Sequence, residues 1–241
     1  MREAIRRLGV LAAISVLIGA SVQLMMPAPA AASTTSICKS QPIPAGYVVT
    51  AEGVSPSCPG NYPNTWTITL PDPNGTAMCK GVTAVPDRYV IIAEGSSAEC
   101  PGNFPNTWSI RQAPTNTAIS ICKVSPRPEG WVITAEGTSA SCPGSYPNTW
   151  TIAYPAVGAT GGMTVCSVSD LRPHFVITAQ GYSLSCPGNS PNTWYIQRAN
   201  TSGTTVICAI SPYPPQFVVV GTTNTSSCVT GSPNAKIIQR V

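Results

Sequence analysis

Charged side chains are scarce in this sequence: Asp, Glu, Lys and Arg make up 9% of the 241 residues, and His174 is the only histidine. Three of the 13 basic residues, Arg2, Arg6 and Arg7, lie at the N-terminus. Residues 33–241 therefore carry ten Lys and Arg against eight Asp and Glu, a net charge of about +2. No cluster of basic residues remains that could neutralise a row of phosphates, so we predict no nucleic-acid partner.

Helical patterning is also missing. Beyond residue 33 no sustained 3.6-residue hydrophobic period occurs, and the chain holds 25 prolines. These two features predict an all-β fold. No second long apolar run follows the N-terminal one, so we expect no membrane partner once the N-terminal segment has been removed. We also predict no cofactor.

The one long apolar run is 8–26, which follows the basic head and precedes the small-residue tail "APAAA". This pattern predicts a secretory signal peptide over residues 1–32, with cleavage after Ala32. The run has 19 residues, close to the length of a membrane span, so an uncleaved anchor is the alternative. We therefore predict a secreted or extracellular protein.

Ten cysteines are present, and all of them follow the predicted leader. An even number of cysteines in an exported chain indicates disulfides. A zinc site is not expected, because neighbouring cysteines are 20 to 24 residues apart and only one histidine exists. The cysteines are Cys38, Cys58, Cys79, Cys100, Cys122, Cys142, Cys166, Cys186, Cys208 and Cys228.

Every second cysteine of this series, starting with Cys58, recurs at intervals of 42, 42, 44 and 42 residues, which indicates an internal repeat. We divide the chain into repeat 1 (33–73), repeat 2 (74–116), repeat 3 (117–159), repeat 4 (160–202) and a divergent, terminal repeat 5 (203–241). Each repeat contains about three segments of strand composition, for example "YVVTAEG" at 47 and "TWTITL" at 65. About three short antiparallel strands per repeat favour an open array over the alternative, a closed five-bladed propeller-like ring.

Two disulfide connectivities fit this spacing. Pairing within repeats joins Cys38 to Cys58 and so on along the chain. A shifted pairing joins Cys58 to Cys79 and leaves Cys38 to meet Cys228, which would favour a ring. A unit of about 42 residues buries little core by itself, so either scheme would act as a staple.

The phrase "CPGNYPNTW" at Cys58 returns with small changes at Cys100, Cys142 and Cys186. In it, Gly60 can adopt the positive φ of a type II turn, and the Asn64 side chain can bond nearby backbone. We interpret the phrase as two turns that position a tryptophan in the core. The four tryptophans are Trp66, Trp108, Trp150 and Trp194.

One position of this phrase is a candidate for ligand binding. Tyr62, Phe104 and Tyr146 occupy it in repeats 1 to 3, whereas repeat 4 has Ser190, so the turn itself does not require an aromatic residue. A flat aromatic ring beside amide groups is typical of a shallow saccharide site. The amides predicted to contribute are Asn61, Asn64, Asn103 and Asn106.

Two further positions could hold catalytic residues. Glu52, Glu94 and Glu136 give way to Gln180 and Thr222 in the later repeats, so we expect hydrogen-bond acceptors for turn N–H groups and not acid–base catalysts. His174, near Asp170, could belong to a hydrolytic site, but no nucleophile-elbow motif accompanies it.

From these patterns we expect a secreted, non-enzymatic, multivalent, lectin-like protein that binds carbohydrate or another cell-surface polymer, because several weak sites on one chain gain avidity. One alternative is a structural or adhesive surface protein with disulfide-stapled β repeats. A second alternative is a secreted enzyme. No catalytic residue and no metal ligand is predicted, and the oligomeric state is left open.

Overall fold

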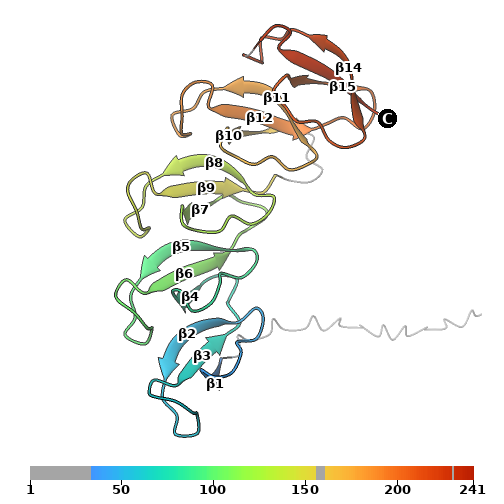
Figure 1. The fold of residues 1–241 in the computed structure, drawn as a ribbon. Helices are drawn as coiled ribbons and strands as arrows, with labels where there is room; N and C mark the ends of the chain where they lie inside the picture. The colour runs from blue at the N-terminus through green and yellow to red at the C-terminus, as the bar shows by residue number, and fades with distance from the viewer. Residues whose placement is uncertain (1–33, 156–160, 230) are drawn as a thin grey trace, which may run out of the picture. The chain divides into compact units, whose positions relative to one another are not determined.

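A computed structural model describes residues 34–155, 161–229 and 231–241, so the predicted signal peptide lies outside the described residues. These residues form fifteen strands and no helix, three strands within each predicted repeat (Figure 1). Within the described part of the chain there is accordingly no helix that could cross a membrane. The strands are β1 (Thr35–Cys38), β2 (Val48–Gly53), β3 (Thr65–Thr69), β4 (Thr76–Cys79), β5 (Tyr89–Gly95), β6 (Thr107–Gln112), β7 (Ile119–Cys122), β8 (Val132–Gly137), β9 (Thr149–Ala153), β10 (Met163–Cys166), β11 (Phe175–Gly181), β12 (Thr193–Arg198), β13 (Thr204–Cys208), β14 (Phe217–Thr223) and β15 (Ala235–Arg240).

Every repeat folds into the same three-stranded sheet, in which the third strand lies between the first and the second. In repeat 1, β3 pairs antiparallel with β1 and with β2, so that Trp66 faces Ile37 on one side and Glu52 on the other. The second strand is bulged in all five repeats, in repeat 1 between Val49 and Ala51. The prediction of antiparallel three-stranded repeats is confirmed.

The disulfides follow the pairing within repeats. Cys38 bonds to Cys58, and the same connection recurs as Cys79–Cys100, Cys122–Cys142, Cys166–Cys186 and Cys208–Cys228. Each bond ties the end of the first strand to the turn that precedes the third strand, across a Cα–Cα distance of 5.3 to 5.4 Å. The shifted pairing is therefore wrong, and so is the argument for a ring that rested on it.

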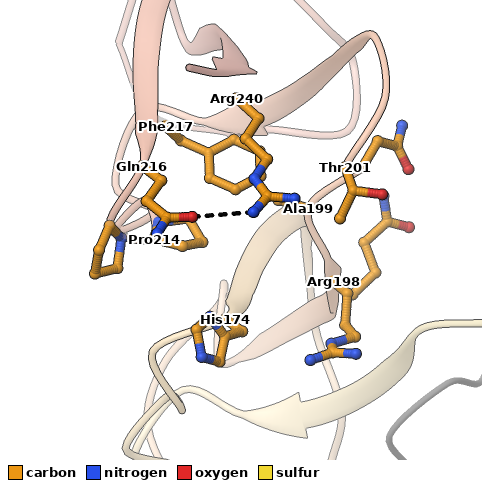
Figure 2. A pocket seen from close by; sticks show the side chains of 11 residues that line it. His174, Arg198, Ala199, Thr201, Pro214, Gln216, Phe217 and Arg240 are labelled. Carbon is orange, nitrogen blue, oxygen red and sulfur yellow. Dashed lines mark hydrogen bonds between the residues drawn. The ribbon is translucent and has the colours of Figure 1, made fainter.

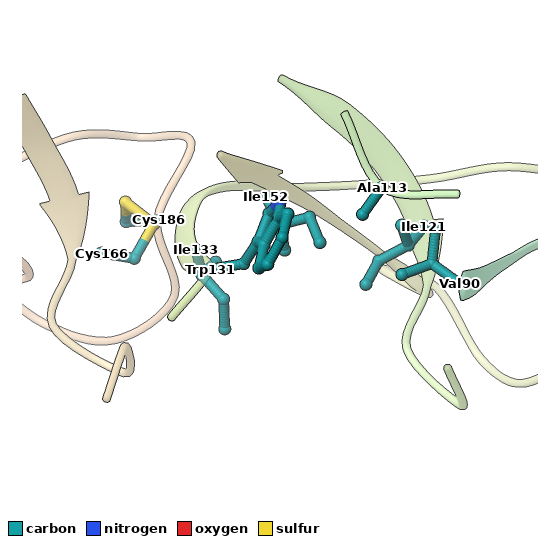
Figure 3. Packing of buried hydrophobic residues seen from close by; sticks show 8 residues of the cluster. All are labelled: Val90, Ala113, Ile121, Trp131, Ile133, Ile152, Cys166 and Cys186. Carbon is teal, nitrogen blue, oxygen red and sulfur yellow. A yellow bond between two sulfur atoms is a disulfide. The ribbon is translucent and has the colours of Figure 1, made fainter. Parts of the chain in front are cut away.

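The hydrophobic core runs across the repeat boundaries. Figure 3 shows one cluster in which Ile133 and Ile152 of repeat 3 pack with Val90 of repeat 2 and with the Cys166–Cys186 disulfide of repeat 4. The same pattern joins Val49 and Ile68 of repeat 1 to the disulfide of repeat 2. Because the disulfide of one repeat fills the core of the repeat before it, each unit depends on its neighbour for burial of its apolar face.

Hydrogen bonds also connect consecutive repeats. The backbone N–H of Glu52 donates to the carbonyl of Glu99, and that of Glu136 donates to the carbonyl of Ser185. A buried serine, Ser169, accepts a bond of 2.8 Å from the N–H of Ile133 and donates one of 3.0 Å back to its carbonyl. These bonds satisfy backbone groups of the second strand, which lies at the edge of its sheet and has no strand partner on its outer side.

The array is open among the described strands, since β1 pairs with β3 alone and β15 pairs with β13 and β14. Its two end repeats differ in how deeply the second strand is buried. Val48 and Val49 of repeat 1 are fully buried, whereas Val218 and Val219, at the same position in repeat 5, are each 41% exposed. The open array is confirmed, and among the described residues no further repeat packs on this strand of repeat 5 as repeat 2 packs on the strand of repeat 1.

Candidate functional site

The turn of repeat 1 is held by the side chain of Asn64, which is 2% exposed. Its Oδ1 accepts a hydrogen bond of 2.9 Å from the N–H of Ser55, and its Nδ2 donates to the carbonyls of Ser55 and Cys58 at 2.9 and 2.7 Å. Gly60 has a φ of 97°. The predicted positive φ of Gly60 and the predicted bonds of the Asn64 side chain to nearby backbone are both present, and the same three bonds recur at Asn106, Asn148, Asn192 and Asn234.

The aromatic residues of the turn point into solvent. Tyr62 is 63% exposed, Phe104 is 65% exposed and Tyr146 is 64% exposed, which are nearly identical values in three successive repeats. Each ring precedes a proline in a cis peptide bond, and the cis bond is also present at Ser190 and Ser232. The turn conformation is therefore the same with and without the aromatic ring.

The four amides predicted beside these rings divide into two kinds. Asn61 and Asn103 are exposed, and they are free to meet a ligand together with the neighbouring ring. Asn64 and Asn106 are buried, and both ends of their amides bond to backbone. We therefore assign Asn64 and Asn106 to the turn and keep Asn61 and Asn103 in the candidate site.

The four tryptophans, predicted as core, are half-buried, and each packs against a buried cluster. In repeats 1 to 3 a lysine covers the indole: the Nζ atoms of Lys39, Lys80 and Lys123 lie 4.0, 4.0 and 4.2 Å from the ring centroids. A cation over an indole face contributes about 0.5–1 kcal/mol. The tryptophan is thus stacked between the core and an ammonium group.

Each of these lysines also pairs with the glutamate of its own repeat, as in the ion pair between Lys80 and Glu94. We expected Glu52, Glu94 and Glu136 to accept bonds from turn N–H groups. Their partner in the structure is instead the lysine of the same repeat. Burial lowers the pKa of the Lys80 ammonium below its ordinary value, although the ammonium contacts both Glu94 and Trp108.

Repeats 4 and 5 replace both partners together. Where repeats 1 to 3 have lysine, repeat 4 has Ser167 and repeat 5 has Ala209, and the glutamate becomes Gln180 and Thr222. The Gln180 side chain accepts a bond of 3.0 Å from the N–H of Val229 in repeat 5, so at this one position the expected turn N–H acceptor is confirmed.

A pocket of about 550 Å³ lies between repeats 4 and 5 (Figure 2). His174, Arg198 and Arg240 line it together with Phe217, and an Arg240 guanidinium N–H donates to the Gln216 side chain at 3.1 Å. A second pocket of about 450 Å³ between repeats 3 and 4 shares His174 and Arg198 with the first. Sequence analysis missed these arginines as a group, because they come together only when the ends of neighbouring sheets are adjacent.

His174 is exposed and lines both pockets. Its presumed acidic partner, Asp170, forms an ion pair with Arg127, and no hydrogen bond joins Asp170 to His174 among the described residues. Within the described residues no three His, Cys, Asp or Glu side chains gather as they would to hold a metal ion. His174 and Asp170 therefore do not form the acid–base pair that the enzymatic alternative would use among the described residues.

Besides the arginines, two further groups of residues were not predicted from the sequence. Lys39, Lys80 and Lys123 each follow the first cysteine of a repeat, and their joint disappearance with the glutamates is a signal that comparison of the repeats reveals. Repeat 4 also exposes Tyr182 by 57% and Leu184 by 89%, just before its second cysteine. Alignment of the repeats places both after the glycine that ends the second strand, but nothing in the sequence marks them as exposed apolar residues.

Comparison with protein-family models, with curated proteins and with solved structures found no match for this chain. The repeat geometry and its exposed groups are therefore the basis for a functional proposal.

Proposed function

We propose that this chain is a secreted, non-enzymatic, multivalent binding protein of lectin-like character, which recognises carbohydrate or another cell-surface polymer. The observation that carries the proposal is the equal exposure of Tyr62, Phe104 and Tyr146 on one rigid turn in three successive repeats. An aromatic ring fixed in water on a hydrogen-bonded turn loses little entropy when a sugar face stacks on it.

The repetition of the ring supports a polymer as ligand. A single exposed ring with one flanking amide, such as Tyr62 with Asn61, offers a small contact and therefore weak binding. Rings on one chain bind a repeating polymer together, and linked sites increase apparent affinity roughly 10²- to 10⁴-fold. Five disulfides agree with an oxidising compartment outside the cytoplasm, and secretion itself is part of the proposal.

The test is a pull-down of purified, oxidised residues 33–241 on insoluble polysaccharides and cell walls, with free sugars as competitors. We expect saturable retention that one sugar releases. Replacement of Tyr62, Phe104 and Tyr146 by alanine together should lower apparent affinity by roughly a hundredfold or more, because it removes linked contacts.

The matched control replaces three exposed apolar residues outside these turns, Val124, Val206 and Tyr213, by alanine. This control should bind as the unmodified protein does. If the protein is retained on no polymer, or if both triple variants bind equally well, the lectin-like proposal fails and a structural or adhesive role becomes the better account.

A further inference from the structure

Charge is distributed unequally along the array. Residues 34–155 contain six Lys and Arg against seven Asp and Glu, whereas residues 156–241 contain four against one. The single acidic residue of the second segment, Asp170, is paired with Arg127 of repeat 3. The positive charge of repeats 4 and 5 is thus not neutralised within those repeats.

Two of these charges occupy equivalent positions. Arg198 ends β12 opposite Phe175, and Arg240 ends β15 opposite Phe217. The corresponding residues of repeats 1 to 3 are Leu70, Gln112 and Tyr154. The turn conformation and strand register need no arginine at this position. The arginines of the last two repeats therefore add a guanidinium group to a fold that does not depend on it.

We propose that the pocket between repeats 4 and 5 is a second binding site, which takes a carboxylate or sulfate group carried on a sugar. Its ionisable lining residues, His174, Arg198 and Arg240, are all of the basic types. Arg240 uses one N–H for Gln216, and the guanidinium retains other donors of its five. Arg198 has no hydrogen-bonding or ionic partner among the described residues.

The rest of the lining fits a sugar that carries such a group. Phe217 and Pro214 provide an apolar surface beside the guanidinium of Arg240, while Asn200 and Thr201 provide neutral hydrogen-bonding groups (Figure 2). Guanidinium groups bind carboxylates and sulfates through paired N–H donors, with stronger bonds than neutral donors form. The volume of about 550 Å³ lies in the range of about 300–1,000 Å³ that is typical of small-ligand sites.

This site is distinct from the exposed turn rings. The third strands of repeats 4 and 5 begin just after the turn, at Thr193 and Ala235, and end at the pocket with Arg198 and Arg240. The two kinds of site therefore lie at opposite ends of the strand. Because they share no residue, the second site and the proposed function can fail separately.

Titration calorimetry of the oxidised protein at low and at moderate NaCl concentration tests the proposal, with trigalacturonate, a sulfated trisaccharide and maltotriose as probes. We expect binding of at least one anionic probe, no binding of maltotriose in this pocket, and weaker binding as salt increases. The two anionic probes distinguish a carboxylate ligand from a sulfate ligand.

The double variant Arg198→Gln and Arg240→Gln should lower affinity for the anionic probe at least tenfold, since each lost charged hydrogen bond costs roughly that factor. Arg111→Gln is the matched control, because Arg111 is an exposed arginine on β6 that does not line this pocket. Thermal unfolding of each variant verifies that it is folded, and Arg198→Gln alone serves if the double variant is not.

Three results would overturn the proposal: neither anionic probe binds, maltotriose competes equally for the pocket, or the double variant binds as Arg111→Gln does. In each case the turn rings remain testable by the alanine variants of Tyr62, Phe104 and Tyr146, so failure of this site leaves the proposed function standing.

Discussion

Repeats 1 to 3 and repeats 4 and 5 have the same framework but different chemistry. The first group has an exposed aromatic residue in the turn and a lysine that contacts both glutamate and tryptophan, as Lys123 does with Glu136 and Trp150. The second group has Ser190 or Ser232 in the turn and an arginine at the end of the third strand. The disulfide, the turn asparagine and the bulge are common to both groups.

This difference distinguishes residues that the fold requires from residues that vary without affecting the fold. Residues present in all five repeats maintain the turn and the core, whereas residues that change between the groups can change without altering strand register. Tyr62 and Arg198 belong to the second class, which is why both are candidates for ligand contact. Framework substitutions should therefore have equal effects in both groups, and substitutions at the variable positions should not.

Loss of a buried disulfide should have the largest effect. Cys122→Ala with Cys142→Ala should lower the free energy of unfolding by about 3 kcal/mol from loop entropy and by roughly 1–2 kcal/mol more from lost packing. The equivalent change at Cys166 and Cys186 should cost as much, because both pairs are equally buried. Urea unfolding of the oxidised proteins measures both.

Cys38 and Cys58 provide the contrast within this experiment. Both are half-buried, since no repeat precedes them among the described residues. Their replacement by alanine should cost only the loop term of about 3 kcal/mol. A cost as large as that in repeat 3 would contradict the view that each disulfide also fills the core of the preceding repeat.

The turn asparagine should rank second. Asn148→Ala leaves the N–H of Ser139 and the carbonyls of Ser139 and Cys142 without their partner in a buried turn. We expect a loss of about 3 kcal/mol, and the same loss for Asn192→Ala, whose amide makes the same three bonds. Urea unfolding again provides the measurement.

Asn103→Ala is the control for the asparagine pair, because Asn103 is exposed in a turn of the same kind. Its cost should stay within about 0.5 kcal/mol. Clearly unequal losses at Asn148 and Asn192 would show that the two groups of repeats do not share one framework.

The strands and the repeat could be predicted from the sequence because their signals are local. The segment "YVVTAEG" at 47 forms β2, Val48–Gly53, and the turn role of Asn64 follows from its place before a strand. The order of strands within each sheet, with the third in the middle, could not be predicted in this way. It depends on pairing between segments that are separated by a disulfide loop, which short-range patterning does not encode.

The candidate sites were predicted less completely for the same reason. Tyr62 could be identified because the turn tolerates its loss, a comparison that the repeats themselves supply. Asn64 is close to Tyr62 in the sequence and was therefore predicted to contribute to the same ligand site, although the Asn64 amide is buried. Arg198 and Arg240 are 42 residues apart in the chain, and only packing of repeat 4 on repeat 5 places both in one pocket.

The lysine contacts should have a smaller effect, confined to the first group. Lys123→Met removes the ion pair with Glu136 and the cation over Trp150, so the free energy of unfolding should fall by about 1 kcal/mol. In a double-mutant cycle with Glu136→Gln, the two changes should not add, because they remove one shared interaction. Fully additive losses would mean that the pair contributes nothing.

The reverse experiment places the pair in repeat 4. Ser167→Lys with Gln180→Glu introduces both partners beside Trp194, which already faces position 180 across the sheet. We expect no more than about 1 kcal/mol of stabilisation, offset in part by loss of the Gln180 bond to the Val229 N–H. A large destabilisation would instead show that the two groups differ in backbone geometry around the tryptophan.

The smallest expected effect concerns the aromatic residue that begins the second strand. Tyr89 donates a hydrogen bond of 2.6 Å to the Pro71 carbonyl, and burial together with the nearby Asp72 carboxylate raises its pKa above the ordinary value of 10.0. The unfolded chain therefore loses this proton at lower pH than the folded chain does, so stability declines as the pH rises through 10.0 toward the folded pKa. Phe175 and Phe217 hold this position in repeats 4 and 5 without a hydroxyl group. Tyr89→Phe should thus reduce the free energy of unfolding by less than about 1 kcal/mol at neutral pH, and the loss of stability at alkaline pH should be shallower in this variant. Urea unfolding over this pH range measures both effects. Parallel pH profiles for the two proteins would exclude a role for the Tyr89 proton.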